Sequence, residues 1–377
     1  MITFVNSNKE DEMSLNKDNY CIIMAGGIGS RFWPVSKTKK PKQFIDVLGV
    51  GESLLQTTYK RFERLCPKEN IYIVTNKQYR DIVFEQLAGI DRECVLLEPI
   101  RRNTAPCVAY ADFKIRRKNP NAKIVVAASD HLITDEDEFI SILEKAFAAV
   151  ERDDVLITLG IKPTFPNTGF GYIQYVDNEQ YGMDEDVKKV KLFTEKPEYN
   201  MAVQFVKSGD FLWNAGIFVW SLRSIDKAMK EFLPDVYELF SKGENIYNTD
   251  AEEAFIEETY AACPSISIDY GVMEKASNVY VIPSGFGWND IGTWAALYSV
   301  RKKDAEGNAV VGRNVLTYDT RNCLIDMPKD KLVVLQGLED FIIVESDNIL
   351  MICRKGEEQR IKEFVTDVEI EKGTEYL

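Results

Sequence analysis

Residues 20–44 read YCIIMAGGIGSRFWPVSKTKKPKQF, and the rest of the chain can be organised around this stretch. Its first six residues form a short apolar run, which predicts a buried strand. The run ends in a glycine-rich segment, where backbone N–H groups can approach and bind an anion such as a phosphate. Arg31 and Lys42 follow and add two positive charges. Together these features predict a polyphosphate-binding site.

Two common phosphate-binding motifs are excluded by the residues around these glycines. A Walker A loop requires Gly-Lys followed by Ser or Thr, and the segment lacks that combination. The dinucleotide-binding fingerprint requires a third glycine where this chain has Phe32. A purely structural turn between a strand and a helix remains an alternative. The added segments 31–34 (RFWP) and 41–44 (PKQF) favour the phosphate site.

Composition limits the partners and the chemistry. The 377 residues suffice for one large α/β domain with a smaller one, or for two comparable domains. A formal net charge of −14 argues against a nucleic-acid partner, because a phosphate backbone requires a basic surface. His131 is the only histidine, so chemistry that requires two histidines is excluded. The candidates that remain are carboxylates, cations and a hard divalent metal.

The sequence predicts a cytoplasmic protein with reduced thiols. Its seven cysteines are scattered without a CxxC pair, which favours buried thiols over disulfides. Residues 1–19 are polar and acidic and lack the apolar centre of a signal peptide, so we expect a flexible N-terminal arm. No run approaches the ~18 apolar residues of a membrane span, and no membrane partner is expected.

Apolar runs alternate with helical patterns, which predicts an α/β fold with a doubly wound, mixed sheet of the Rossmann-like type. We expect strands at 20–25, 71–75, 94–97, 123–128 and 155–161, and helices at 54–65 and 135–150. Further strands or loops are expected at 169–172, 189–197 and 213–220, with helices near 198–207, 223–241 and 251–261.

The pattern changes at residue 308 to short strands separated by turns. A helix is expected at 357–365, after the last of these strands. We therefore expect a large α/β domain at 20–300 and a small β domain at 308–377, joined by a polar segment near 296–308.

Polar residues gather where the predicted strands end. Ligands of open α/β sheets bind at the carboxyl ends of the strands, so residues at these ends can share one cleft. Segment 98–106 reads EPIRRNTAP, which predicts a helix start with Thr104 as its N-cap. The structural alternatives are an ordinary capped helix, a turn-forming aspartate and a surface ion pair of little energetic value. The residues at or just after strand ends are Gly26, Glu98, Asp130, Glu195 and Asn214.

Five motifs together carry a family resemblance. They are GGxGxRxWP with PKQF at 26–44, EPxxRNTAP at 98–106, TEKP at 194–197, WNxGxF at 213–218 and GWNDIGTW at 287–294. The chain resembles the sugar-nucleotide pyrophosphorylases and, within them, the family of mannose-1-phosphate guanylyltransferases (GDP-mannose pyrophosphorylases). The tail resembles the short β-helical domain of this family. We expect the short form, without the isomerase domain that is fused to some long relatives.

The resemblance implies roles for individual residues. Arg31 and Lys42 would be catalytic cations, with Lys42 near the α-phosphate, and Asp130 and Asp290 would hold Mg²⁺. His131 is expected to be structural rather than a base. The implied nucleotide-binding residues are Ala25, Gly26, Gly27, Gly29, Ser30, Arg31, Glu98, Asn103 and Thr104. The implied sugar-phosphate-binding residues are Gly171, Tyr172, Glu195, Lys196, Asn214 and Asp269.

The implied reaction converts GTP and α-D-mannose 1-phosphate into GDP-mannose and pyrophosphate. An oxygen of the sugar phosphate would attack the α-phosphorus in line, with Mg²⁺ assisting. Two alternatives stay open: another sugar 1-phosphate or nucleotide, or a catalytically silent homologue that binds GDP-mannose. We also expect a homodimer. Because Arg31 and Lys42 are expected on a loop, their replacement should leave folding intact.

Overall fold

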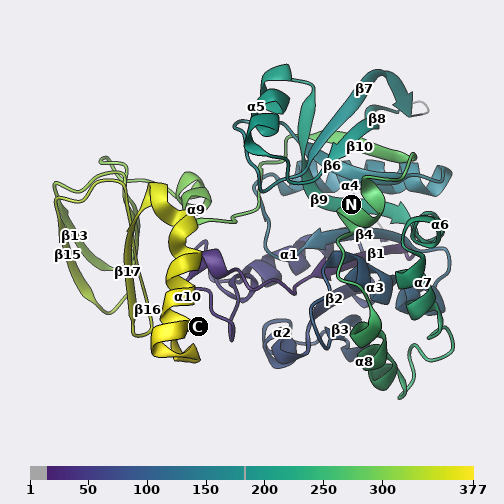
Figure 1. The fold of residues 1–377 in the computed structure, drawn as a ribbon, viewed down its shortest axis with the longest axis horizontal. Helices are drawn as coiled ribbons and strands as arrows, with labels where there is room; N and C mark the ends of the chain where they lie inside the picture. Colours follow the sequence, from purple (N-terminus) through teal and green to yellow (C-terminus); the bar gives the residue numbers. More distant parts are fainter. Residues whose placement is uncertain (1–14, 182–183) are drawn as a thin grey trace, which may run out of the picture.

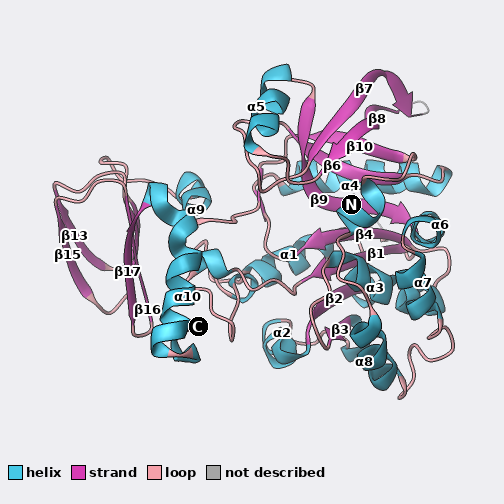
Figure 2. Ribbon diagram, in the orientation of Figure 1, coloured by secondary structure: helices cyan, strands magenta, loops and turns pink. Residues whose placement is uncertain are grey.

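A nine-stranded mixed sheet forms the centre of the computed structural model, which describes residues 15–181 and 184–377 (Figure 1 and Figure 2). The first four strands run parallel, whereas β9 is antiparallel to both of its neighbours, β4 and β6. The strand order is β3 (Val95–Glu98), β2 (Ile71–Asn76), β1 (Asn19–Met24), β4 (Lys123–Ala128), β9 (Phe211–Ser221), β6 (Leu156–Ile161), β10 (Val279–Ser284), β8 (Asp184–Thr194) and β7 (Tyr172–Tyr181).

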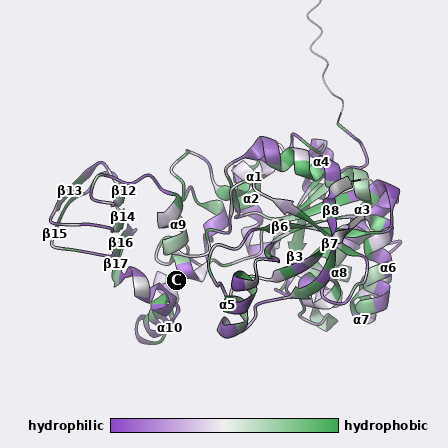
Figure 3. Ribbon diagram, turned by 90° about the horizontal axis from the view of Figure 1, so that it is seen from above, coloured by the Kyte–Doolittle hydropathy of each residue, from purple (hydrophilic) through white to green (hydrophobic). Residues whose placement is uncertain are grey.

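Helices cover both faces of this sheet, because its strands alternate apolar side chains between two cores. On β1, Tyr20 and Ile22 join the core under α3 (Thr104–Lys118), whereas Cys21 and Ile23 join the core under α1 (Leu54–Phe62) and α4 (Glu136–Arg152). In Figure 3 the strands of the large domain are mostly coloured as hydrophobic. The α/β prediction is confirmed. The helices are α1 (Leu54–Phe62), α2 (Arg80–Gln86), α3 (Thr104–Lys118), α4 (Glu136–Arg152), α5 (Tyr199–Ser208), α6 (Leu222–Phe232), α7 (Pro234–Ser241), α8 (Glu252–Ala262) and α9 (Trp294–Val300).

Three helix predictions were wrong in detail. The helix expected at 223–241 is broken into α6 and α7, because Pro234 lacks the N–H group that a continuous helix requires. Thr104 is not the N-cap of α3, since the Asn103 side chain accepts a hydrogen bond from the Thr104 N–H at 2.9 Å. The helix expected at 357–365 is a 3-10 helix over Lys355–Arg360 followed by α10 (Ile361–Lys372).

The C-terminal strands build a small β-helix-like domain. β12, β14 and β16 form one parallel ladder and β13 and β15 another, while β17 closes the domain antiparallel to β16. In Figure 1, α10 lies on the side of this domain that faces the large domain. The strands are β12 (Ala309–Val311), β13 (Asn314–Tyr318), β14 (Leu324–Asp326), β15 (Leu332–Gln336), β16 (Phe341–Ser346) and β17 (Ile349–Arg354).

The two domains share a hydrophobic core beneath the glycine-rich segment. Phe32 and Trp33, which follow the glycines, pack in one cluster with Trp294 and with Ile361 of α10. The Trp33 indole N–H donates a hydrogen bond to the backbone oxygen of Tyr376 at 2.9 Å. The position of the glycine-rich loop therefore depends on the C-terminal domain.

Further expectations concerned the cysteines, membrane spans and the N-terminal arm. All seven cysteines are buried and unpaired, as the sequence predicted. Among the described helices, none has the length and apolar character needed to cross a membrane. Most of the arm predicted at 1–19 lies outside the described residues, and β1 already begins at Asn19.

Candidate active site

The glycine-rich loop is held from behind through its carbonyl groups. The Gln43 side-chain amide donates hydrogen bonds to the backbone oxygens of Ala25 and Gly27 at 3.0 and 2.9 Å, and Ser36 donates to Ile28 O at 2.8 Å. In a planar trans peptide the N–H group points away from the carbonyl. The N–H groups that follow these carbonyls therefore point to the opposite side, where an anion can bind.

Two residues of the glycine-rich loop have roles in the fold itself. Gly29 has φ of 64°, and a Cβ there would lie 2.9 Å from Cβ of Lys42, so only glycine fits. The N–H of Ala25 donates to Val74 O in the sheet at 2.8 Å. Its N–H is thus committed to the fold and is not available to a ligand, while the nucleotide contact predicted for Ala25 stays a prediction.

Lys42 is buried and holds three chain segments together. Its ammonium lies 2.9 Å from an oxygen of Asp130 and donates to the backbone oxygens of Asp290 and Ile291 at 2.9 and 2.8 Å. These partners use all three donors of the ammonium. The expectation that Lys42 is a loop residue whose replacement leaves folding intact was wrong, because the residue is only 3% exposed and is committed to protein oxygens. Its expected place near the α-phosphate stays a prediction.

A short strand pair brings the two predicted metal ligands to one cavity. β5 (Leu132–Ile133) pairs antiparallel with β11 (Trp288–Asn289), and this pairing joins the segments of Asp130 and Asp290, which line one cavity and both contact the Lys42 ammonium. Asp290 Oδ1 accepts a hydrogen bond from Gly292 N at 3.1 Å. We call the shared space of about 360 Å³ the phosphate-side cavity. Its lining residues are Gly29, Ser30, Arg31, Phe32, Lys42, Asp130, His131, Asp290, Gly292 and Lys362.

Some polar groups of the phosphate-side cavity have protein partners and others do not. Burial raises the pKa of Asp130, but Lys42 and His131 outweigh it, so the pKa lies below its ordinary value. Burial lowers the pKa of His131, whose Nδ1 accepts from the Trp288 indole at 3.3 Å. By contrast, Nε of Arg31 is buried without a hydrogen-bond partner. Such an unpaired donor is costly unless a ligand satisfies it.

The cavity suits Mg²⁺ with substrate oxygens rather than a closed protein cage. Asp130 stays ionised and its side chain is one third exposed, at 33%, so it can offer an oxygen to the cavity. Magnesium in phosphate-transfer sites typically takes one or two carboxylates and fills its octahedron with waters and phosphates. Asp130 and Asp290 meet this requirement, and the described residues contain no cluster of three or more His, Cys, Asp or Glu that could hold a metal alone.

The predicted base-binding residues lie where β3 ends and α3 begins. Glu98 is buried, accepts from the Tyr260 hydroxyl at 3.0 Å, and lies close behind Gly26. Burial raises its pKa to about 7, although the Tyr260 hydrogen bond opposes the shift. Asn103 is exposed, whereas the Thr104 hydroxyl accepts from Ile268 N at 2.8 Å. The Asn103 side chain is therefore more available than that of Thr104 to hydrogen-bond the edge of a base.

The predicted sugar-phosphate residues form a second polar cluster. Lys196 Nζ lies 2.7 Å from a Glu195 oxygen, and Asn214 Nδ2 donates to Asp269 Oδ1 at 2.8 Å. A Cβ at Gly171 would fall 2.4 Å from Glu195 Oε2, so glycine is required for this approach. Burial, followed by repulsion from Glu195, raises the pKa of Asp269 to about 7.

Two residues of this group are not placed as predicted. Asn214 was expected near a strand end but lies inside β9, at an irregularity in its pairing with β6. Such an irregularity redirects a side chain, here toward Asp269. Tyr172 is fully buried with its ring against Phe205, so its side chain shapes the loop and is not open to a ligand.

Three residues of the site were missed from the sequence. Gln43 lies within the quoted PKQF motif, and its amide could have been suspected of holding the loop. Tyr260 and Lys362 gave no sequence signal, because each reaches the site from a distant helix.

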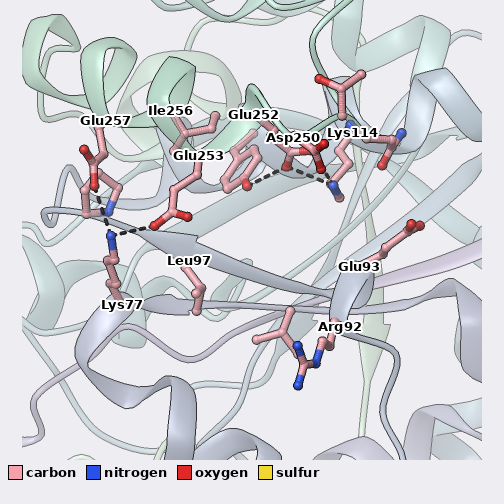
Figure 4. A pocket seen from close by; sticks show the side chains of 15 residues that line it. Lys77, Arg92, Glu93, Leu97, Lys114, Asp250, Glu252, Glu253, Ile256 and Glu257 are labelled. Atoms are coloured by element: carbon pink, nitrogen blue, oxygen red, sulfur yellow. Dashed lines mark hydrogen bonds and ion pairs between the residues drawn. The ribbon is translucent and has the colours of Figure 1, made fainter.

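A second hollow lies beside the edge strand β3 and the helix α8 (Figure 4). Its volume is about 460 Å³. Lys77 there binds Glu253 and Glu257 at 2.7 and 3.0 Å, and Lys114 binds Glu252 at 2.6 Å. These cations are bonded to protein carboxylates, whereas Nε of Arg31 has no hydrogen-bond partner.

Comparison with known proteins places this architecture in a family. Residues 20–307 match the family model described as Nucleotidyl transferase, and 312–368 match a MannoseP isomerase/GMP-like beta-helix domain. The chain is 36% identical to the mannose-1-phosphate guanylyltransferase of Salmonella montevideo, covering 94% of this chain and 75% of that protein. It is 37% identical to the alginate biosynthesis protein AlgA of Pseudomonas fluorescens, covering 92% and 71%.

A solved structure gives the same result in three dimensions. The crystal structure described as mannose-1-phosphate geranyltransferase from Thermus thermophilus aligns with a TM-score of 0.82 at 29% identity, covering 93% of this chain and 99% of that one. The likeness therefore includes both domains. The chain belongs to the nucleotidyl transferase family and, within it, to the mannose-1-phosphate guanylyltransferases.

Proposed function

We propose that this chain makes GDP-mannose and pyrophosphate from GTP and α-D-mannose 1-phosphate. The observation that carries the proposal is the phosphate-side cavity, where the loop amides and Arg31, whose Nε has no hydrogen-bond partner, face Asp130 and Asp290. Arg31 is suited to a polyphosphate, since a guanidinium can bind phosphate oxygens in a bidentate fork. The sugar phosphate would bind at Glu195 and Lys196.

The reaction requires positioning more than proton transfer. An oxygen of the sugar phosphate bonds to the α-phosphorus, the bond from that phosphorus to the bridging oxygen breaks, and pyrophosphate leaves with the electron pair. Because the nucleophile is already anionic, no general base is needed. The chain must hold two repelling anions in line, and Arg31, Lys196 and the loop amides supply the positive field. Lys42 acts as a positioning residue for Asp130.

Mg²⁺ is the proposed cofactor, with Asp130 and Asp290 as its protein ligands. When bound, it would offset the charge on the phosphates and orient the two substrates. Asp290→Asn keeps the size and removes the charge, so it should raise the Mg²⁺ concentration needed for half-maximal activity without lowering the melting temperature. The activity of the Asp130→Asn/Asp290→Asn double variant should be only slightly lower than that of the less active single variant. Losses that multiply would instead assign the two aspartates to separate tasks.

The substrate assignment is tested by pyrophosphate release over a matrix of nucleoside triphosphates and sugar 1-phosphates. GTP with mannose 1-phosphate should give the highest kcat/KM, and Asp290→Asn at a low Mg²⁺ concentration serves as the control with reduced activity. A clear preference for UTP or dTTP with glucose 1-phosphate would overturn the base and sugar assignments. Tight GDP-mannose binding without turnover would identify a silent homologue.

We also propose a cytoplasmic homodimer. Support for self-association comes from apolar side chains that project from the small domain, among them Leu332 at 68% and Val334 at 58% exposure on β15. Light scattering during gel filtration measures the assembly, and a monomer at micromolar concentration would contradict it.

A further inference from the structure

Lys362 lies in the phosphate-side cavity although it belongs to the C-terminal helix. It stands in the first turn of α10, and it lines the cavity together with Ser30, Arg31 and Asp290. The large domain supplies the other lining residues of this cavity. One side chain of the small domain therefore reaches the space where the large domain would hold phosphates.

Packing fixes the helix that carries this lysine. The neighbouring Ile361 is fully buried in the core that contains Phe32, just after the glycine-rich loop. Glu358, just before α10, accepts a hydrogen bond from the Ala295 N–H at 2.8 Å. These contacts just before Lys362 hold the start of α10 against the loop, so the lysine is placed by the fold rather than by a chance surface approach.

The charge of Lys362 has no structural use that the fold reveals. Within the described chain no carboxylate lies at ion-pair distance from its ammonium, whereas the adjacent Arg360 lies 3.1 Å from Glu363. A cation in the first turn of a helix is disfavoured by the helix dipole, so the charge costs the helix stability. An anion in the cavity would offset that cost.

The other cations of the cavity show what is missing for a polyphosphate. The three donors of Lys42 are used by protein oxygens, which leaves Arg31, whose Nε has no hydrogen-bond partner, as the large domain's cation for a ligand. Glu358 lies near enough to interact with the Arg31 charge but does not satisfy this donor. A triphosphate carries several negative charges, and the two aspartates add more unless a metal neutralises them. A second uncommitted cation beside Arg31 fits this requirement.

We propose that Lys362 binds the phosphates of the nucleoside triphosphate that leave as pyrophosphate, so that the small domain completes the nucleotide site. The inference rests on the proposed function. The leaving-group end is favoured because Lys362 lies on the side of the glycine-rich loop and Arg31, whereas Glu195 and Lys196 form the separate sugar-phosphate cluster.

The test compares Lys362→Gln, Lys362→Arg and Lys362→Glu with Lys372→Gln, a matched control at the far end of the same exposed helix. Lys362→Gln should raise the KM for GTP, and for pyrophosphate in the reverse reaction, by about tenfold, which is the effect of one partly screened charge. In Lys362→Arg these KM values should stay near those of the parent protein, and in Lys362→Glu they should rise further than in Lys362→Gln. The KM for mannose 1-phosphate should change by less than about twofold.

A binding measurement separates this inference from the proposed function. Calorimetric titration of pyrophosphate with Mg²⁺ should show the same loss in Lys362→Gln, with an unchanged melting temperature and normal binding in Lys372→Gln. Equal pyrophosphate affinity in Lys362→Gln and the parent, or equal rises in both substrate KM values, would overturn the inference. If the parent bound pyrophosphate through Lys362 yet failed to use GTP with mannose 1-phosphate, only the proposed function would fall.

Discussion

The phosphate-side cavity and the hollow beside β3 both contain a buried lysine paired with a carboxylate. Lys42 lies 2.9 Å from Asp130 in the first, and Lys114 lies 2.6 Å from Glu252 in the second (Figure 4). By residue type and by the burial of the lysine the two pairs look alike. What distinguishes them is the state of the surrounding groups.

In the hollow beside β3 the pair is enclosed by further protein partners. Glu252 also accepts from the Tyr110 hydroxyl and from Asn248 N, both at 2.7 Å, so its charge is fully bonded. In the phosphate-side cavity, Nε of Arg31 lacks a partner and Asp130 remains partly exposed. A buried ion pair alone therefore indicates structure, while unpaired charge next to it indicates a ligand.

Replacing Lys42 should have the largest effect on turnover. Lys42→Ala removes the partner of Asp130 and frees two carbonyls, so we expect almost no activity and a loss of about 3 kcal/mol in unfolding free energy. Chemical denaturation and pyrophosphate release measure the two effects. Lys42→Arg is the conservative control. Full stability in Lys42→Ala would show that the ion pair does not hold the segments together.

Replacing Arg31 should separate activity from stability. Arg31→Ala removes a donor that has no protein partner at Nε, so the melting temperature should stay within about 2 °C. Activity should nevertheless fall by about 10²–10³ in kcat, as expected for the loss of one preorganised donor. Arg31→Lys should recover part of the rate. Near-normal turnover in Arg31→Ala would indicate that the glycine-rich loop is only a structural turn.

Replacing Lys114 should give the opposite result and so sharpen the comparison. Lys114→Met leaves Glu252 buried without its ion-pair partner, which should cost about 3–5 kcal/mol in unfolding free energy. The kcat/KM of the folded enzyme should not change. Adding Glu252→Gln should restore part of the stability. A selective loss of GTP binding in Lys114→Met would instead give the hollow beside β3 a substrate role.

The smallest expected effect on turnover accompanies a pH dependence of stability caused by Glu98. Its folded-state pKa of about 7 lies above the value of an exposed glutamate, so the folded state binds the extra proton. The associated stability is present below about pH 4.5 and is lost as pH rises through 7, by at most about 3 kcal/mol. In Glu98→Gln this part of the slope should disappear. If the parent protein and Glu98→Gln had identical pH profiles of unfolding free energy, Glu98 would not titrate in this range.

Local sequence patterns were sufficient for the elements that depend on neighbours in the chain. The apolar run at 20–25 and the glycines after it predicted β1 and its loop, since strand burial and positive φ are local properties. The two-domain pattern and the α/β class followed from periodicity in the same way. Helix boundaries were less certain, as the break at Pro234 shows.

The tertiary structure alone decided which charges meet and which are already satisfied. The pairing of the two-residue strands β5 and β11 brings Asp130 and Asp290 to one cavity, and strands this short leave no periodic pattern to detect. Whether Lys42 is free or bound depends on carbonyls near residue 290, and Lys362 reaches the cavity only because α10 packs against Phe32. Sequence supplied the residue types of the site, whereas long-range packing set their partners, because hydrogen bonds and burial depend on distance in space rather than along the chain.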